Sequence, residues 1–322
     1  MNNNLDKLQS VPLVSVLMPV YNGEAYLNEA IDSILFQTFA DFEFIIINDG
    51  STDKTEDIIL SYHDQRIHYY KNDKNLGIVG TLNRGLDLCK GKYIARMDAD
   101  DVSMPQRFEK QVAYMNAHPN VVACGCLYSI YGKENRGAVD VATDADDVRY
   151  DMALYCQVLH PMVLMRREIF GKYSLNYKRE YESAEDYKLF TELLKYGDIV
   201  NIPQILGLYR MNPDSISHKR YNTQKKLSER IKKEYLTQYG INVQYTISEI
   251  VENDSGEIVY NTLLSYYPFV LKSSSKTWIK KNFITKLKRF VSNKNFCTKM
   301  KLIKEFNKVL SIKNIISIII TQ

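Results

Sequence analysis

The sequence predicts an α/β fold in which helices cover a central sheet, followed by a basic, helical C-terminal region. Over residues 14–127, short apolar runs alternate with longer amphipathic stretches, and polar or acidic residues follow several of the apolar runs. Lysine and arginine accumulate near the end of the chain. Because strands that alternate with helices usually lie parallel in one sheet, the first half should form such a sheet.

The first half contains five strand-like runs with four helix candidates between them. Apolar runs predict strands at 14–19, 42–48, 66–71, 92–97 and 121–127. Apolar residues at helical spacing predict helices at 24–36, 54–62, 76–89 and 105–118. Ser103 and Gln106 have the spacing of a capping box before the last of these helices. The second half predicts helices at 144–156 and 183–195 and strands at 161–165 and 205–209.

The composition is that of a globular protein. The chain has 322 residues, 45% of them hydrophobic and 25% charged, which indicates one large domain with an appendage. We expect a catalytic domain over 1–215, with halves 14–127 and 128–215, and a helical basic region over 216–322. No apolar run reaches the roughly 20 residues of a membrane span, and the polar N-terminus does not resemble a signal peptide. Its five cysteines lack metal-ligand spacing, so reduced thiols in a cytoplasmic protein are expected.

Polar side chains follow three of the predicted strands. Tyr21 and Asn22 come after the first strand, Asp49 after the second, and Asp98, Asp100 and Asp101 after the fourth. Ligands of parallel sheets bind at the carboxyl ends of the strands, so these residues should meet in one crevice. Carboxylates two positions apart can hold a ribose and a Mg²⁺ or Mn²⁺ ion, although alone they would also fit a solvated turn.

Three strings carry a family resemblance: VSVLMPVYNGEAYL from Val14, FIIINDGSTD from Phe44 and GKYIARMDADD from Gly91. Together, in order and spacing, they resemble the family 2 glycosyltransferases, and the resemblance extends to about Ser217. It implies a GT-A fold, a Rossmann-like nucleotide-binding mixed sheet with flanking helices. It also implies an inverting transferase that uses Mn²⁺ or Mg²⁺ and takes a sugar from a nucleotide diphosphate.

The resemblance assigns roles to the residues at the strand ends. Tyr21 matches the aromatic residue that stacks on the base, and Asp49 the carboxylate that accepts from the base edge, usually uracil. Asp98 matches the residue nearest the ribose and Asp100 the metal ligand. A UDP-sugar donor is therefore expected. Other residues predicted to bind the nucleotide sugar are Pro19, Asn22, Glu24, Asn83, Arg96 and Ala99.

A carboxylate pair opens the predicted helix at 183–195. Glu185 and Asp186 match the family's Glu-Asp motif, which implies that Asp186 is the base removing the acceptor proton. Glu185 would orient groups beside it or raise its basicity. Attack opposite the diphosphate would then invert the anomeric carbon in one displacement. Seen alone, the pair would also fit two charges that favour a helix N-terminus.

Three further residues are candidates for the same site. His160 matches the family's His-Pro strand and is predicted to face the nucleotide sugar, although a structural histidine fits equally well. Arg210 lies in a segment that resembles one near the diphosphate, where its charge would offset the leaving group. His218 is a candidate second metal ligand, because some relatives place a histidine near it.

The C-terminal region predicts a surface for anionic lipid. From Lys272 to Gln322 the chain has 13 lysine or arginine residues and one acidic residue, Glu305. Residues 279–291 and 302–310 read as basic amphipathic helices, which either lie on an anionic membrane or pack on the catalytic domain. By analogy with relatives, the acceptor would be a glycan or a lipid-linked glycan of surface polysaccharide synthesis at the cytoplasmic face of the membrane. Processive synthases of the family carry a Q-x-x-R-W segment, but the single tryptophan here, Trp278, follows Lys276 and Thr277. One sugar per encounter is therefore expected.

Two other enzyme classes would need different residues after the first strand. A sugar nucleotidyltransferase needs a glycine-rich, arginine-containing loop after the first strand, and a dinucleotide oxidoreductase needs G-x-G-x-x-G there. Residues 19–23 provide neither. Apolar stripes in the C-terminal region argue against nucleic acid as a partner. A catalytically inactive protein that only binds a sugar nucleotide remains an alternative.

Overall fold

The computed structural model describes residues 11–132, 136–139, 141–211 and 220–246, together with residues 249, 265 and 266. The chain divides into two compact units. The first comprises Met1–Val148 and Cys156–Leu227, and the second Arg149–Tyr155 and Ser228–Gln322.

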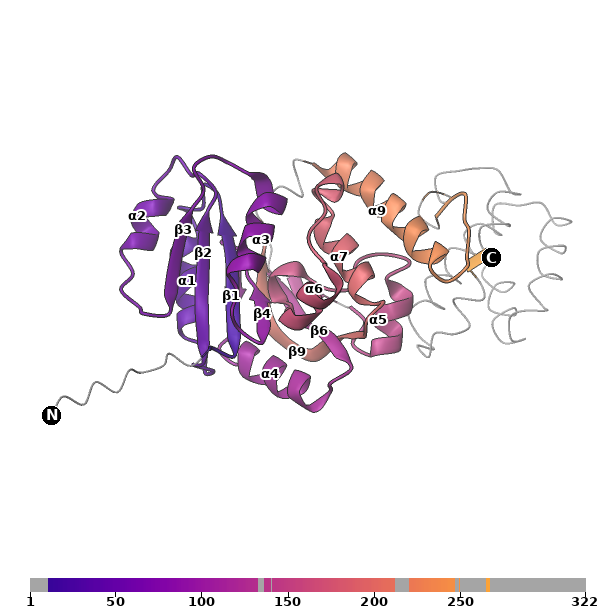
Figure 1. Ribbon diagram of the computed structural model, residues 1–322, viewed down its shortest axis with the longest axis horizontal. Coiled ribbons are helices and arrows are strands. Elements are labelled where there is room, and N and C mark those ends of the chain that lie inside the picture. The colour runs from indigo at the N-terminus through magenta and orange to yellow at the C-terminus, as the bar shows by residue number, and fades with distance from the viewer. Residues whose placement is uncertain are drawn as a thin grey trace, which may run out of the picture. The chain divides into compact units, whose positions relative to one another are not determined.

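A nine-stranded mixed sheet runs through the first unit in the order β3-β2-β1-β4-β8-β6-β9-β5, with β7 beside β6. Figure 1 shows β3, β2, β1 and β4 side by side. Four neighbouring strands are parallel: β3 (Ile67–Lys71), β2 (Phe42–Asn48), β1 (Val14–Val20) and β4 (Tyr93–Arg96). Every residue of β1, β2 and β4 is buried, because helices cover both faces. This confirms the α/β fold that the apolar runs predicted.

The other strands make the sheet mixed. They are β8 (Leu164–Arg166), β6 (Val121–Tyr131), β7 (Arg136–Ala138), β9 (Asp198–Arg210) and β5 (Val102–Ser103). The β8 strand runs antiparallel to both β4 and β6, whereas β9 runs parallel to β6 and antiparallel to β5. The predicted capping box was wrong: Ser103 lies in β5, and Gln106 precedes α4 without a side-chain capping bond.

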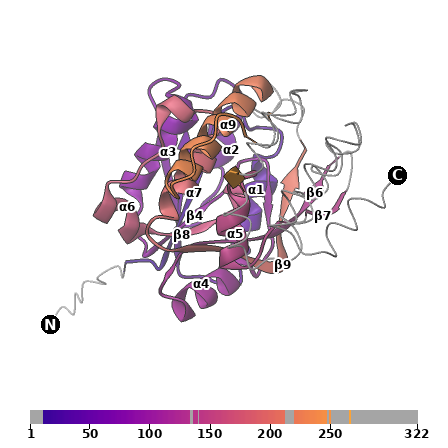
Figure 2. The ribbon, with the colours of Figure 1, turned by 90° about the vertical axis from the view of Figure 1, so that its right-hand side faces the viewer.

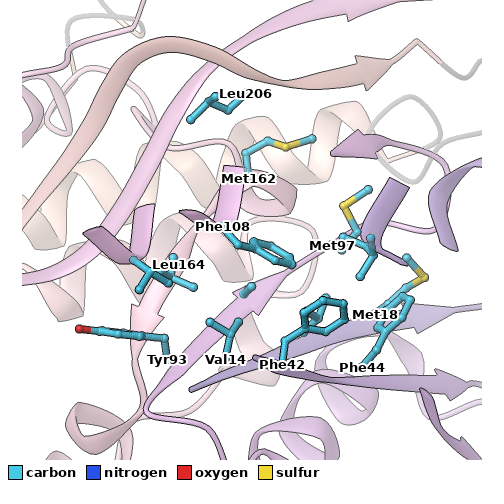
Figure 3. Close-up of a cluster of buried hydrophobic side chains, with 14 of the residues drawn as sticks. Val14, Met18, Phe42, Phe44, Tyr93, Met97, Phe108, Met162, Leu164 and Leu206 are labelled. Atoms are coloured by element: carbon cyan, nitrogen blue, oxygen red, sulfur yellow. The ribbon is translucent and has the colours of Figure 1, made fainter. Parts of the chain in front are cut away.

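Helices lie on both faces of the sheet. Those wholly within the first unit are α1 (Leu27–Leu35), α2 (Thr55–Leu60), α3 (Gly77–Leu88), α4 (Arg107–Ala117), α6 (Arg167–Tyr173) and α7 (Glu185–Leu193), with 3-10 turns η1 (His160–Met162) and η2 (Arg179–Tyr181). Two further helices, α5 (Ala145–Asp151) and α9 (Tyr221–Thr237), continue into the second unit. The helices α1 and α4 share a buried apolar cluster with β1 and β2 (Figure 3). The opposite face of β1 meets α3, where a Cβ on Gly85 would lie 2.2 Å from Leu17. Figure 2 accordingly shows α3 and α4 on opposite sides of β4 and β8.

The parallel register brings three strand ends to one edge of the sheet. Val20 of β1 pairs with Asn48 of β2, and Leu17 of β1 pairs with Arg96 of β4. The loops that begin at residues 21, 49 and 97 therefore leave the sheet side by side. This is the arrangement that the crevice prediction required.

In the second unit, the described residues include a small polar core. Tyr235 donates from its hydroxyl to the Arg149 carbonyl at 2.7 Å. Glu229 and Lys232 are buried and form an ion pair at 2.7 Å. The predicted basic helices at 279–291 and 302–310 lie outside the described residues. Within the described part of the chain, no helix is both long enough and apolar enough to cross a membrane.

Candidate active site

The loop after β1 is tied to the loop after β2. Asn22 adopts a left-handed φ of 50°, which asparagine tolerates better than most residues. Its N–H donates to the Ser51 hydroxyl at 2.9 Å, and its Oδ1 accepts from the Thr52 N–H at 2.9 Å. Glu24 likewise accepts from the Lys54 N–H at 2.9 Å. The two loops therefore hold each other and leave Tyr21 with 51% of its surface exposed.

Two smaller predicted residues lie close to these loops. Pro19 is buried in β1 opposite Ile47 of β2. Ala99 packs against the apolar cluster, and a Cβ on Gly23 would lie 3.7 Å from the Ala99 Cβ. The loops after β1 and β4 are thus in close approach, so both can contribute to one site.

Asp49 is buried and held by three donors. Its Oδ1 accepts from the Asn72 amide at 2.6 Å and from the Leu76 N–H at 2.8 Å, and its Oδ2 accepts from the Gly77 N–H at 3.0 Å. The last of these bonds comes from the first residue of α3, where a helix favours negative charge. These bonds fix the carboxylate, and Oδ2 still has a lone pair for a ligand.

Three carboxylates gather after β4. Oxygen atoms of Asp98, Asp100 and Asp101 lie within 4.8 Å of one another. Asp101 is 1% exposed; its Oδ1 accepts from the Arg210 N–H at 2.8 Å, whereas its Oδ2 has no hydrogen-bond partner. Burial and the charges of Asp98 and Asp100 raise the Asp101 pKa well above its usual value. Crowded carboxylate oxygens with one unsatisfied buried atom fit a hard divalent cation such as Mg²⁺ or Mn²⁺.

Arg210 holds this acidic loop from the end of β9. Its Nε donates to the Asp100 carbonyl at 2.8 Å, and its guanidinium pairs with the Glu29 carboxylate. The guanidinium carbon also lies 4.3 Å from the ring centroid of Tyr26 and 4.6 Å from that of Tyr131. Its positive charge is therefore already partnered within the protein. His218, the predicted candidate for a second metal ligand, lies outside the described residues.

Arg96 is buried beneath the acidic loop. It is 3% exposed and forms an ion pair with Asp98, while its Nε has no hydrogen-bond partner. Burial opposes its charged form, but the Asp98 carboxylate outweighs this effect and raises the Arg96 pKa. The positive charge of Arg96 also partly opposes the burial that raises the pKa values of Glu185 and Asp186, so the two halves of the predicted site lie within electrostatic reach of one cation.

Glu185 and Asp186 are the first two residues of α7. Glu185 is buried, and burial together with the charge of Asp186 raises its pKa to about 7. Burial also raises the pKa of Asp186, which is only partly buried. Ser183, at a strained φ of 91°, donates its N–H to Glu185 at 2.7 Å. The pair is therefore more basic than ordinary carboxylates, as proton removal requires.

His160 and Asn83 both contact Tyr177. The Nε2 of His160 lies 2.8 Å from the Tyr177 hydroxyl, and burial together with Arg96 lowers the His160 pKa well below its usual value. A neutral imidazole is the result. The Asn83 side chain exchanges two hydrogen bonds of 2.9 Å with the Tyr177 backbone. Both residues thus hold the segment that leads to α7.

Two residues of this site had no predicted role. Asp101 belongs to the predicted acidic string after the fourth strand, but only Asp98 and Asp100 were assigned a function there. Asn72 had no signal, because it lies in a polar turn and reaches Asp49 only through the fold.

The fold is shared with a solved protein structure. The structure of S. aureus TarS, residues 1–349, in complex with UDP-GlcNAc has a TM-score of 0.60 to this chain at 18% sequence identity. The match covers 95% of this chain and 90% of that one. The protein therefore has the GT-A fold, the class that its sheet order and acidic strand ends define.

Sequence relatives identify the family. The sequence model of Glycosyl transferase family 2 matches residues 15–174. An uncharacterized glycosyltransferase of Haemophilus influenzae is 32% identical over 277 residues, which are 80% of this chain and 86% of the relative. The chain belongs to glycosyl transferase family 2. An Escherichia coli relative, 28% identical over 81% of this chain and 94% of its own length, is the UDP-Glc:alpha-D-GlcNAc-diphosphoundecaprenol beta-1,3-glucosyltransferase WfgD.

Proposed function

We propose that this glycosyltransferase is metal-dependent and inverting, and that it moves a sugar from a UDP-sugar to a hydroxyl of a glycan or lipid-linked glycan in surface polysaccharide synthesis. One observation carries the proposal: buried Arg96 pairs with Asp98 and acts electrostatically on Glu185 and Asp186. A cation-binding cluster and a basic carboxylate pair thus share one buried charge. The name of the E. coli relative supports a UDP-sugar donor and a lipid-linked acceptor.

On the donor side, Asp98, Asp100 and Asp101 would hold Mn²⁺ or Mg²⁺. When bound, such an ion offsets the charge that grows on a departing diphosphate. The exposed ring of Tyr21 is available to stack on a base, and Asp49 retains acceptor capacity for its edge. Pro19, Asn22, Glu24 and Ala99 shape the same loops and would line the nucleotide.

On the acceptor side, Asp186 takes the proton of the attacking hydroxyl. It is the partly exposed member of the pair, so an acceptor can approach it, whereas Glu185 is buried behind it. The negative charge of Glu185 disfavours ionisation of its neighbour and so raises its basicity. Arg210, already partnered, would orient the acidic loop, and His160 would set the position of Tyr177.

We also propose that the enzyme acts at the cytoplasmic face of a membrane. A lipid-linked acceptor would bring it there, and the basic region over 216–322 would bind anionic lipid. The catalytic domain would then be residues 1–215. Binding to vesicles with and without anionic lipid measures this attraction, which should weaken with salt.

The test is a thermal-shift and turnover screen of nucleotide sugars with and without Mn²⁺. We expect a UDP-sugar to raise the unfolding temperature only when the metal is present, and UDP to be released when an acceptor is added. Stabilisation without UDP release, with every lipid-linked and free glycan tried, would instead favour a protein that only binds sugar nucleotides.

The activity should depend on pH through the carboxylate pair. A raised folded-state pKa means that Glu185 is protonated below a pH of about 7. Because base catalysis needs the ionised pair, kcat/KM should fall as the pH drops through this value. Removing one negative charge with Glu185→Gln should move the midpoint to lower pH, as measured by UDP release. A wild-type profile that stays flat down to the ordinary glutamate range would contradict this assignment.

A further inference from the structure

Arg107 is a buried arginine that the proposed chemistry does not use. It is the first residue of α4 and is 0% exposed. No carboxylate of the described residues forms an ion pair with it, and burial lowers its pKa to about 10, which still leaves it charged at neutral pH. Burying such a charge is costly unless its hydrogen bonds serve the fold or the site.

The Arg107 guanidinium connects two segments of the chain by donating to a backbone carbonyl of each. Its Nη1 donates to the Pro161 carbonyl at 2.8 Å, and its Nη2 donates to the Arg96 carbonyl at 3.0 Å. Nη1 also lies 3.6 Å from the Met97 sulfur and 3.4 Å from the Met162 sulfur. Arginine suits this position because its planar fork offers several donors in fixed directions.

These two carbonyls lie where the pairing of β4 with β8 ends. Ala95 pairs with Leu164, and the Arg96 N–H still donates to the Val163 carbonyl at 3.0 Å. Beyond this point the segment that precedes β8 no longer runs as a strand but forms the turn η1, which contains Pro161. Arg107 therefore supplies donors to two buried carbonyls that the sheet no longer satisfies.

Arg96 and the residue next to Pro161 carry side chains on the two sides of the proposed site. The side chain of Arg96 pairs with Asp98, and the residue before Pro161 is His160, which bonds to Tyr177. We propose that Arg107 is a positioning residue for sugar transfer. It fixes the backbone of Arg96 and Pro161 and so aligns the three clustered aspartates after β4 with the carboxylate pair that opens α7. This inference rests on the proposed function.

Arg166 offers a matched control at the other end of the same strand pair. It is also buried, and it pairs with Tyr93 at the start of β4. Its guanidinium donates to the carbonyls of Val121 at 2.7 Å and Met115 at 2.6 Å. Arg166 thus joins α4 to the start of β6 by their backbone carbonyls, and among the described residues none of its hydrogen bonds reaches the acidic loop after β4.

The experiment compares Arg107→Met with Arg166→Met in the full chain. Methionine keeps most of the volume and removes every donor, so both variants should unfold at lower temperature. Only Arg107→Met should reduce kcat for UDP release, by about tenfold to a hundredfold, since displacements near 1 Å cost rates of this order. It should also weaken Mn²⁺ binding followed by the electron paramagnetic resonance of the free ion.

Arg107→Lys provides a second measurement. An ammonium keeps the charge but lacks the fork that reaches both carbonyls, so we expect partial recovery of kcat and of Mn²⁺ affinity. Equal kcat and Mn²⁺ affinity for the folded fractions of Arg107→Met and Arg166→Met would overturn the positioning role. Should Arg107→Met not fold, wild-type kcat and Mn²⁺ affinity in Arg107→Lys would overturn it as well.

Failure of the proposed transferase function can be distinguished from failure of the positioning role of Arg107. If wild type releases no UDP with any donor and acceptor, the transferase proposal fails, while Mn²⁺ affinity and the NMR shifts of the His160 ring still report on Arg107. The positioning role predicts that both change in Arg107→Met and that neither changes in Arg166→Met.

Discussion

Asp186→Asn is expected to reduce sugar transfer about a thousandfold, within the range that general base catalysis contributes. Asparagine keeps the shape of the side chain and can still accept from the Tyr187 N–H, as Asp186 does at 2.7 Å. It cannot take a proton. The kcat for UDP release should therefore collapse, while stabilisation by UDP-sugar and Mn²⁺ in a thermal-shift assay should persist.

Glu192→Gln is the matched control on the same helix. Glu192 lies away from the proposed proton transfer, and it pairs with Lys188 at 3.0 Å and also with Lys195. Its loss should leave kcat near the wild-type value. Comparable turnover in Asp186→Asn and Glu192→Gln would show that α7 does not supply the base.

The sequence predicted strands best where burial is complete. The runs in β1 and β2 are apolar on both faces, so their ends were placed within one residue. The predicted strand at 205–209 is only part of β9, which runs Asp198–Arg210. Asn201, Pro203 and Gln204 interrupt its apolar pattern, and pairing with β6 extends it regardless. A residue pattern read locally cannot contain that pairing.

Distant contacts explain the other differences. The two residues of β5 become a strand only because they pair with Gly207 and Leu208. The acidic string and the Glu-Asp pair could be read from sequence, because each is a short local motif placed at an element boundary. Arg107 could not, since a helix-opening arginine normally suggests an exposed side chain. Its role depends on two carbonyls, at residues 96 and 161, that only the folded sheet brings together.

Asp100→Ala is expected to abolish the Mn²⁺-dependent rise in unfolding temperature that a UDP-sugar produces. A ligand at free concentration L stabilises a protein by RT ln(1 + L/Kd), so the rise in Kd caused by losing one of three clustered oxygen ligands removes most of the effect. The metal-free protein should behave differently. Because the charge of Asp100 helps to raise the Asp101 pKa, its removal relieves repulsion, and the unfolding temperature without metal should hold or rise.

This opposite response separates loss of a ligand from loss of the fold. The Arg210 Nε donates to the backbone carbonyl of residue 100, so this bond survives in the alanine variant and the loop keeps its anchor. Asp41→Ala, an exposed carboxylate just before β2 at the other edge of the sheet, should leave both temperatures unchanged. An intact metal-dependent rise in Asp100→Ala would move the cation site away from the end of β4. The carboxylates there would then be a repulsive cluster without a ligand, and the assignment of donor binding to this edge would fail with them.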